Sequence, residues 1–293
     1  MKNHSPILLR DSLIDKIGAF CSRQDNICFI SPDFGAKALD QFRIDHPECF
    51  IFTGISEQFS VDFAYGLALG SAIPILYGMA PFVTSRCFEQ YKVLFGQTDH
   101  PLLLLGIGPG LSYDHNTISH YTLEDISLFQ SLPSFQIFHP IDIDSGLNLL
   151  NNFVDSPNQV YMRVDRQPLP VNCLDIHTDL RRIGSSYFKK NSNNTLLISY
   201  GSIVFDLLIT DYSLLCLQDL AFISDDILAI INSYDRIILV EESLPNNGIY
   251  SLLRHKVPNA SFFDHKFIDP AIMFCKISQK EARRRFLLSS FCL

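Results

Sequence analysis

The stretch FIFTGISEQFSVDFAYGLALGSAIPILYG, residues 50–78, contains in immediate succession a short apolar strand, a turn, an apolar helix and a second apolar strand. The predicted strands, FIFTGI and IPILYG, do not alternate between apolar and polar residues, and a helix is predicted over Glu57–Leu69. Strands without alternation are typical of parallel sheets that helices cover on both faces. This stretch therefore predicts an α/β fold.

The same order of strands and helices continues on both sides of this stretch. Further strands are predicted from the apolar runs NICFIS, PLLLLGI, FQIFHP and QVYMRV. Helices are predicted around them at residues 9–21, 85–95, 122–130 and 144–154. Thr122 with Asp125 three residues later forms a candidate capping box for one of these helices. Residues 1–168 are therefore expected to form a domain with a mainly parallel sheet flanked by helices.

A polar break at residues 169–192 is predicted to be a linker, because prolines and the polar run KKNSNN replace the apolar pattern around it. The pattern restarts with the strand TLLISYGS and continues to RIILVEES, with helices predicted at residues 203–212, 225–233 and 249–255. The tail SQKEARRRFLLSSF is predicted to be a closing helix whose basic face is solvated. Residues 193–293 are therefore expected to form a second, smaller α/β domain.

The composition excludes several classes of protein. The chain has 293 residues, of which 47% are hydrophobic, and this is too apolar for a disordered protein. A net charge of −8 argues against general nucleic-acid binding. No apolar run reaches about 18 residues, and the start MKNHSPILLRDS lacks a secretory signal, so a cytoplasmic protein without a membrane span is expected. The eight scattered cysteines form no CxxC pair and are expected to be buried thiols rather than zinc ligands.

Three segments follow predicted strands, at the edge where parallel α/β sheets bind ligands. In GISEQ, Glu57 begins a helix, where it acts either as a cap alone or as part of a site. In LYGMAPFVTSRCFEQ, Gly78 and Pro81 are expected to interrupt regular structure, so that the large side chains line either a pocket or the core. In GIGPGLSYDHNTISHYTLED, the glycines are weak evidence for phosphate binding, and His115 and His120 are candidates for acid–base chemistry.

Together these segments resemble the transketolase family of thiamine-diphosphate enzymes. The matching residues of the first domain are SPDFG (31–35), GISEQ (54–58), FVTSR with EQ (82–90), SHYTLEDISLFQSLP (119–133) and HPID (139–142). YMRVDR, YGS (200–202) and LVEE (239–242) continue the resemblance into the second domain. The chain is similar to the carboxyl-terminal half of a transketolase, which consists of the pyrimidine-binding domain and the transketolase C-terminal domain. Such half-length chains occur as one subunit of split transketolases.

The resemblance implies roles for five residues. Glu57 is expected to hydrogen-bond a pyrimidine ring nitrogen of the cofactor, which favours the tautomer that removes the thiazolium proton. Met79 and Phe82 match the side chains that stack on this ring, and Arg86 matches an arginine near the pocket. His120 matches a loop histidine that holds or protonates substrate oxygens. Glu57 and His120 are thus the expected catalytic residues, and Glu57, Met79, Phe82 and Arg86 the expected cofactor-binding residues.

Two departures from the family pattern concern the substrate and the partner. Asp114–Thr117 replaces the usual Gly-Glu-Asp-Gly before the histidine, which leaves open whether the substrates are sugar phosphates or an unusual sugar. The chain lacks the Gly-Asp-Gly motif that normally holds the cofactor diphosphate through magnesium. Mg²⁺ is therefore expected to be bound mainly by a partner, the amino-terminal transketolase subunit, in a heterotetramer in which both domains of this chain also self-associate.

The implied function is thiamine-diphosphate-dependent transfer of a two-carbon ketol unit between sugars, in a complex with that subunit. One alternative is a decarboxylating enzyme similar to deoxyxylulose-phosphate synthase or to the beta subunit of a 2-oxo-acid dehydrogenase. Another is a non-catalytic assembly subunit, and a third is a nicotinamide-binding domain based on GIGPG.

Overall fold

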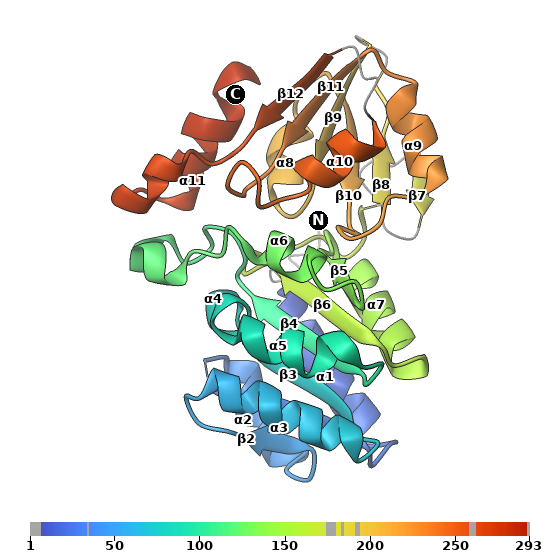
Figure 1. The fold of residues 1–293 in the computed structure, drawn as a ribbon, viewed down its shortest axis with the longest axis vertical. Coiled ribbons are helices and arrows are strands. Elements are labelled where there is room, and N and C mark those ends of the chain that lie inside the picture. Colours follow the sequence, from blue (N-terminus) through green and yellow to red (C-terminus); the bar gives the residue numbers. More distant parts are fainter. Residues whose placement is uncertain are drawn as a thin grey trace, which may run out of the picture.

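The computed structural model describes residues 7–33, 35–173, 180–182, 185–190, 194–257 and 262–291. Within these ranges the chain forms two six-stranded sheets, one in each part of the sequence. Figure 1 shows the first sheet with its helices in the blue to green part of the molecule and the second in the yellow to red part. None of the helices in the described ranges is long and apolar enough to cross a membrane.

The first sheet is parallel throughout, with the strand order β2-β1-β3-β4-β6-β5. Its strands are β1 Ile27–Ser31, β2 Phe50–Phe52, β3 Ile73–Met79, β4 Leu102–Ile107, β5 Phe135–Phe138 and β6 Gln159–Val164. Every residue of β4 and of β6 is buried, as expected for central strands that are covered on both faces. The predicted α/β class with a mainly parallel sheet is confirmed.

Helices pack on both faces of this sheet. They are α1 Leu9–Cys21, α2 Lys37–Asp45, α3 Glu57–Leu69, α4 Ala80–Val83, α5 Phe88–Val93, α6 Asp125–Gln130 and α7 Ile143–Asp155, with the 3₁₀ turns η1 Ser85–Cys87, η2 Phe95–Gln97 and η3 Asp114–His120. On one face, Val61 of α3 and Tyr91 of α5 share a core with Leu104 of β4. On the other face, Leu13 of α1 shares a core with Leu103, the neighbouring residue of β4. Successive strand residues thus point to opposite faces, and both cores are apolar.

The second sheet is mixed, with the strand order β12-β11-β9-β10-β8-β7. Its strands are β7 Leu180–Arg182, β8 Ser185–Phe188, β9 Thr195–Ser199, β10 Ser213–Leu217, β11 Arg236–Val240 and β12 Phe262–Lys266. Around it lie α8 Ile203–Leu207, α9 Asp225–Asn232, α10 Tyr250–Lys256, the 3₁₀ turn η5 Pro270–Phe274, α11 Gln279–Ala282, the π-helical η6 Arg283–Leu288 and η7 Ser289–Phe291. The strands β9 to β12 pair in parallel, whereas β8 pairs antiparallel with β10 and with β7.

The predicted linker at 169–192 is shorter than expected, because β8 lies inside it and belongs to the second sheet. Ser185 and Ser186 of β8 are buried, and buried serines leave no apolar pattern in a sequence. The helix predicted at 203–212 is also shorter, since α8 ends at Leu207. Residues 174–179, 183–184 and 191–193, which fall in or beside the predicted linker, and Cys292 lie outside the described residues.

The predicted capping box at Thr122 is wrong. The helix α6 begins at Asp125, and its N-cap residue Glu124 makes no side-chain cap hydrogen bond. Thr122 instead pairs through its backbone with Gly110, in an isolated antiparallel bridge. Asp125 turns its carboxylate to Arg163 of β6, whose Nε donates to Oδ2 at 2.8 Å in a fully buried ion pair. The carboxylate that the pattern assigned to a helix end is therefore used in the core.

The tail is helical, but the prediction that its basic face is solvated is wrong for one arginine. The side chain of Arg284 is 68% exposed, whereas that of Arg283 is 9% exposed. Arg283 is buried because it pairs with Glu242 at the end of β11 and with Asp206 of α8. Both carboxylates are distant in sequence, so local charge spacing gave no sign of them.

Candidate active site

Glu57 begins α3, just beyond the carboxyl end of β2. The chain reaches it through Gly54, whose φ of +74° lies in the left-handed region that glycine adopts without strain. The Glu57 side chain is 8% exposed, and its Oε2 accepts a hydrogen bond from Arg86 Nη1 at 2.8 Å. Its Oε1 accepts no hydrogen bond from the described residues. The position at a helix N-terminus stabilises the negative charge, and Oε1 is available to a ligand.

Arg86, Phe82 and His120 continue the contact that starts at Glu57. Arg86 lies in η1, and its guanidinium carbon is 4.3 Å from the centre of the Phe82 ring, in cation–π contact. The Phe82 ring, in α4, meets the His120 ring edge-on, with the ring centres 4.9 Å apart and the planes at 70°. Four of the five residues to which the family resemblance gave roles thus form one group, here called the Glu57 cluster.

His120 closes the Glu57 cluster on the side of the β4–α6 loop. Its Nδ1 lies 2.9 Å from Ser119 Oγ. Burial, and then the positive charges of His115 and Arg86, lower the pKa of His120 below its usual 6.5. A neutral imidazole at neutral pH can both accept and donate a proton. His115 is largely exposed and lies beside Asp114, so His120 is the loop histidine that packs against the cluster.

Met79 ends β3 and lines a cavity of about 140 Å³. The prediction that Gly78 and Pro81 interrupt regular structure is wrong. Gly78 lies inside β3, and Pro81 lies in the first turn of α4. Glycine is required at position 78 because a Cβ atom there would lie 2.4 Å from Val83 Cγ1. This close approach brings α4, with Phe82, directly against the end of the sheet.

The same cavity contains two arginines that the sequence alone did not single out. Arg10 of α1 and Arg166, which follows β6, line it together with Asp33, Tyr77 and Tyr113. The Arg166 guanidinium carbon lies 4.1 Å from the centre of the Tyr113 ring. Arg166 stands just after a buried strand, which is a signal for a site, whereas Arg10 lies in an ordinary helix and carries no such signal.

The glycine-rich loop after β4 does not form a phosphate cradle. Gly110 has a φ of +67°, and a Cβ atom there would lie 2.3 Å from Glu242 Oε1. The N–H group of Leu111 donates a hydrogen bond to the same oxygen at 2.7 Å. The loop is therefore shaped around a carboxylate of the second domain, and the nicotinamide-binding alternative loses its support.

The Glu57 cluster fits the aminopyrimidine ring of thiamine diphosphate, the cofactor that the family resemblance implies. A carboxylate oxygen without a partner complements a ring N–H group, and the Phe82 ring offers an aromatic face. Among the described residues, no group of three His, Cys, Asp or Glu side chains is placed to hold a metal ion. The described cysteines are free thiols, and most of them are buried.

The chain is similar to known proteins in both sequence and structure. Residues 5–172 match the family model described as "Transketolase, pyrimidine binding domain". An apulose-4-phosphate transketolase subunit of Phocaeicola vulgatus is 30% identical over 165 residues, which are 56% of this chain and 53% of that protein. The chain thus spans about half the length of this relative. 1-deoxy-D-xylulose-5-phosphate synthase of Corynebacterium glutamicum is 31% identical over 173 residues, 58% of this chain and 26% of that protein.

Among solved structures, a split-gene transketolase described as an inactive beta4 tetramer has the same fold. It matches with a TM-score of 0.73 and 18% sequence identity, and the match covers 90% of both chains. The two sheets described above, and not the first alone, are therefore shared with that protein.

Proposed function

We propose, because this chain belongs to the transketolase family through its pyrimidine-binding domain, that it is the carboxyl-terminal subunit of a split transketolase. With an amino-terminal subunit it transfers a two-carbon ketol unit between sugars and shares thiamine diphosphate with that subunit. The observation that carries this proposal is the Glu57 cluster, in which a buried carboxylate, an aromatic face and a neutral imidazole meet at the carboxyl ends of parallel strands.

Each residue of the Glu57 cluster has a distinct task. Bound thiamine diphosphate supplies the carbon nucleophile of the reaction. Glu57 holds a proton at the pyrimidine ring nitrogen through Oε1, while Arg86 fixes Oε2 and so orients the carboxylate. Such a charge-assisted hydrogen bond contributes about 1.5–3 kcal/mol. Phe82, and Met79 at the end of β3, would offer apolar surface to that ring, and His120 would hydrogen-bond and protonate oxygens of the substrate.

The substrates we propose are sugar phosphates. Arg10 and Arg166 line the same cavity as Met79 and Tyr113. Tyr113 lies on the loop that leads to His120. Guanidinium groups bind phosphate strongly. Arg10 is paired through Nε with Asp11 at 2.7 Å, so Arg166 and the terminal amino groups of Arg10 are the donors that we propose for a phosphate. The name of the P. vulgatus relative, which specifies a sugar phosphate, supports the same substrate class.

The amino-terminal subunit is required, we propose, because it supplies the ligands of the Mg²⁺ ion that holds the cofactor diphosphate. The chain contains no Gly-Asp-Gly. The related fold that was solved as an inactive tetramer of beta chains supports a subunit that is inactive without its partner. The complete enzyme is accordingly proposed to be a heterotetramer in which two copies of this chain associate.

The test is to reconstitute this chain with the Gly-Asp-Gly-containing transketolase subunit of the same genome. We expect the pair, with thiamine diphosphate and Mg²⁺, to transfer a ketol unit from a ketose phosphate to an aldose acceptor, and neither chain to do so alone. Full activity of the isolated chain refutes the need for a partner. Unchanged turnover after Glu57→Ala would leave only an assembly role.

A second candidate is a decarboxylating enzyme, which the similarity to 1-deoxy-D-xylulose-5-phosphate synthase favours. The same Glu57 cluster serves both reactions, because both require the cofactor to be activated at the pyrimidine ring. Pyruvate distinguishes them, since release of carbon dioxide from pyruvate by the reconstituted pair assigns the decarboxylating reaction, and its absence assigns ketol transfer.

A further inference from the structure

We propose that the second domain positions His120, and that Glu242 is the positioning residue through which it does so, together with Gln279 at the start of the C-terminal helix. This inference rests on the proposed function, in which His120 contacts the substrate. It assigns to the second domain a part in the active site of the first.

Glu242 lies just beyond the end of β11, is 6% exposed, and uses both of its oxygens. Its Oε1 accepts hydrogen bonds from the N–H group of Leu111, at 2.7 Å, and from Gln279 Nε2, at 2.8 Å. Its Oε2 accepts a hydrogen bond from Arg283 Nε at 2.5 Å. The contact with the first domain is thus made to the backbone of the β4–α6 loop, at the point where that loop turns toward η3 and His120. Gly110 leaves the space that the carboxylate occupies.

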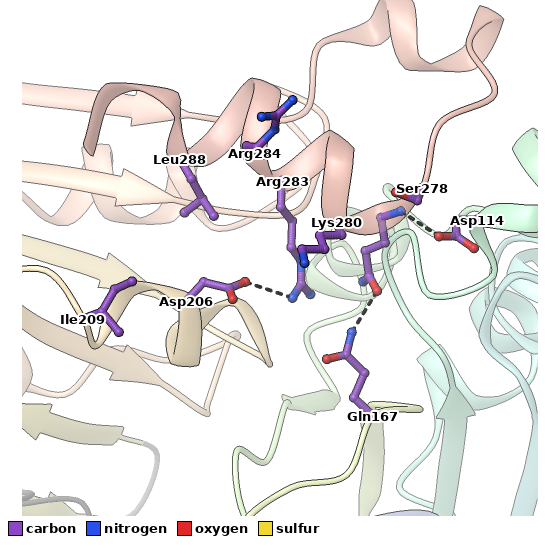
Figure 2. A pocket seen from close by; sticks show the side chains of 10 residues that line it. Asp114, Gln167, Asp206, Ile209, Ser278, Lys280, Arg283, Arg284 and Leu288 are labelled. Carbon is purple, nitrogen blue, oxygen red and sulfur yellow. Dashed lines mark hydrogen bonds and ion pairs between the residues drawn. The ribbon is translucent and has the colours of Figure 1, made fainter. Parts of the chain in front are cut away.

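A second attachment lies three residues further along the same loop. The N–H group of Gln279 donates a hydrogen bond to Asp114 Oδ2 at 2.7 Å, and Gln167 Nε2 donates one to Gln279 Oε1 at 3.0 Å. Figure 2 shows Asp114 and Gln167 converging on this point from the first domain, opposite the helix that carries Arg283. The segment from Leu111 to Asp114 is therefore held at both ends by the second domain.

Asp114 and Gln279 also line a cavity of about 500 Å³, together with Lys280, Arg284 and Ile209 (Figure 2). Away from this cavity, Leu111, Tyr121 and Leu123 of the loop are buried in one apolar core with residues of the second domain. Glu242 and Gln279 add hydrogen bonds to this packing. From Asp114, η3 runs with a kink at Thr117 to His120, whose ring meets Phe82.

The hydrogen bonds differ from this apolar packing in what they fix. Glu242 and Gln279 reach the loop at a main-chain N–H group and at Asp114, and so fix the course of the backbone between Leu111 and Asp114. Within the first domain, Arg166 Nη1 donates a hydrogen bond to Ser112 O of the loop at 2.6 Å, and the bridge between Gly110 and Thr122 joins two parts of the loop to each other.

The first experiment needs neither partner nor cofactor. The 293-residue chain is labelled with ¹³C at Cε1 of its histidines, the His120 signal is assigned with the variant His120→Asn, and it is titrated by NMR. The charged groups around His120 are Arg86 of η1 and His115 of its own segment. In Glu242→Ala we expect the His120 pKa to rise toward 6.5 and its signal to shift, because the imidazole moves away from Arg86 and Phe82.

Two further variants separate positioning from a general loss of stability. Glu241→Gln is the matched control, because Glu241 binds Tyr200, His265 and the N–H group of Ile249, all within the second domain. It is expected to leave the His120 titration unchanged. Asp114→Ala removes the second attachment at a partly exposed loop residue, and is expected to move His120 in the same direction even where Glu242→Ala fails to fold.

The second experiment measures kinetics of the reconstituted pair. A displaced catalytic group costs on the order of 10- to 100-fold in rate, so kcat is expected to fall by that factor in Glu242→Ala while the KM for the cofactor stays within about twofold. Glu242→Gln keeps an oxygen for Leu111 and is expected to recover much of this loss. If the wild-type pair transfers no ketol unit, the proposed function fails, but the titration still decides the positioning. The inference is overturned if Glu242→Ala and Asp114→Ala titrate as wild type, or if Glu241→Gln moves His120 equally.

Discussion

Replacing Glu57 with glutamine separates what this carboxylate does for the fold from what it does for catalysis. For the fold, the variant loses only the charge on one side of the pair with Arg86. Because the Arg86 side chain is 46% exposed, this pair contributes at most about 1 kcal/mol to the free energy of unfolding. Glutamine has the same length as glutamate and its oxygen still accepts the hydrogen bond of Arg86. Glu57→Gln is therefore expected to fold and to assemble with the amino-terminal subunit.

For catalysis, the variant loses the charge-assisted hydrogen bond to the pyrimidine ring. That bond contributes about 1.5–3 kcal/mol, which corresponds to a decrease in kcat of about 10- to 160-fold. The assay is ketol transfer by the reconstituted pair, with the melting temperature of each variant measured alongside. The matched control is Glu89→Gln, which makes the same change of charge at an exposed residue of α5, three positions after Arg86 in the sequence. If Glu57→Gln kept the wild-type kcat, or if Glu89→Gln lost as much, the role given to Glu57 would be refuted.

Three further predictions concern stability and are read from urea denaturation of the isolated chain. Gly110→Ala is expected to lower the free energy of unfolding by at least about 2 kcal/mol, because φ is +67° and the new Cβ would meet Glu242. Its control is Gly66→Ala in α3, where nothing lies within 4 Å of the new Cβ, and this variant is expected to be neutral or slightly stabilising. Equal effects of the two would contradict the tight fit at Gly110. Arg163→Met leaves Asp125 buried without its ion pair and is expected to lower the free energy of unfolding by about 3–5 kcal/mol. Lys266→Met removes the more exposed pair with Asp264 and is expected to lower it by less than about 1 kcal/mol. Burial, together with Arg163, lowers the pKa of His139 below 6.5, so the unfolded chain binds a proton that the folded chain does not, and stability is expected to fall as the pH drops below about 6.5. His139→Gln should flatten this dependence between about pH 7 and pH 5.5, and an unchanged slope would show that His139 is not its source.

Most strands and helices of the first domain could be predicted because burial on both faces leaves a strong signal, whereas the helix α2 was not predicted. Each residue of β4 is buried, so the run PLLLLGI carries no polar residue that would confuse the pattern. The helix from Glu57 to Leu69 was predicted with the bounds that the structure gives it. Where buried positions are polar, the pattern fails, as at Ser185 and Ser186 of β8. A glycine that serves a close approach, such as Gly78, also misleads, because it looks like a break in the strand.

The residues of the candidate site could be predicted only in part. Glu57, Phe82, Arg86 and His120 could be named because they stand in contiguous motifs with family spacing. Their contacts could not be predicted, since they depend on how α3, α4, η1 and η3 are packed. Arg10 is a residue that could not be predicted from the sequence. It faces a cavity that forms only where α1, the end of β3 and the segment after β6 come together, and no local pattern distinguishes it from a surface arginine.

The motifs HPID, YMRVDR, YGS and LVEE, which carry the resemblance beyond the Glu57 cluster, meet in one buried network between the domains. His139 Nε2 lies 3.0 Å from Asp165 Oδ2, Ser202 binds Asp165 through both its N–H group and its hydroxyl, and Arg283 joins Ser202 to Glu242. Burying ions in this way is expensive, and apolar residues of the same volume commonly give equal or greater stability. Stability alone therefore does not account for the network. An apolar interface, however, has no group that can accept the hydrogen bond of a main-chain N–H, and this network ends at the N–H group of Leu111. Its chemistry is explained if the network fixes one loop, and the histidine that the loop carries, in one position.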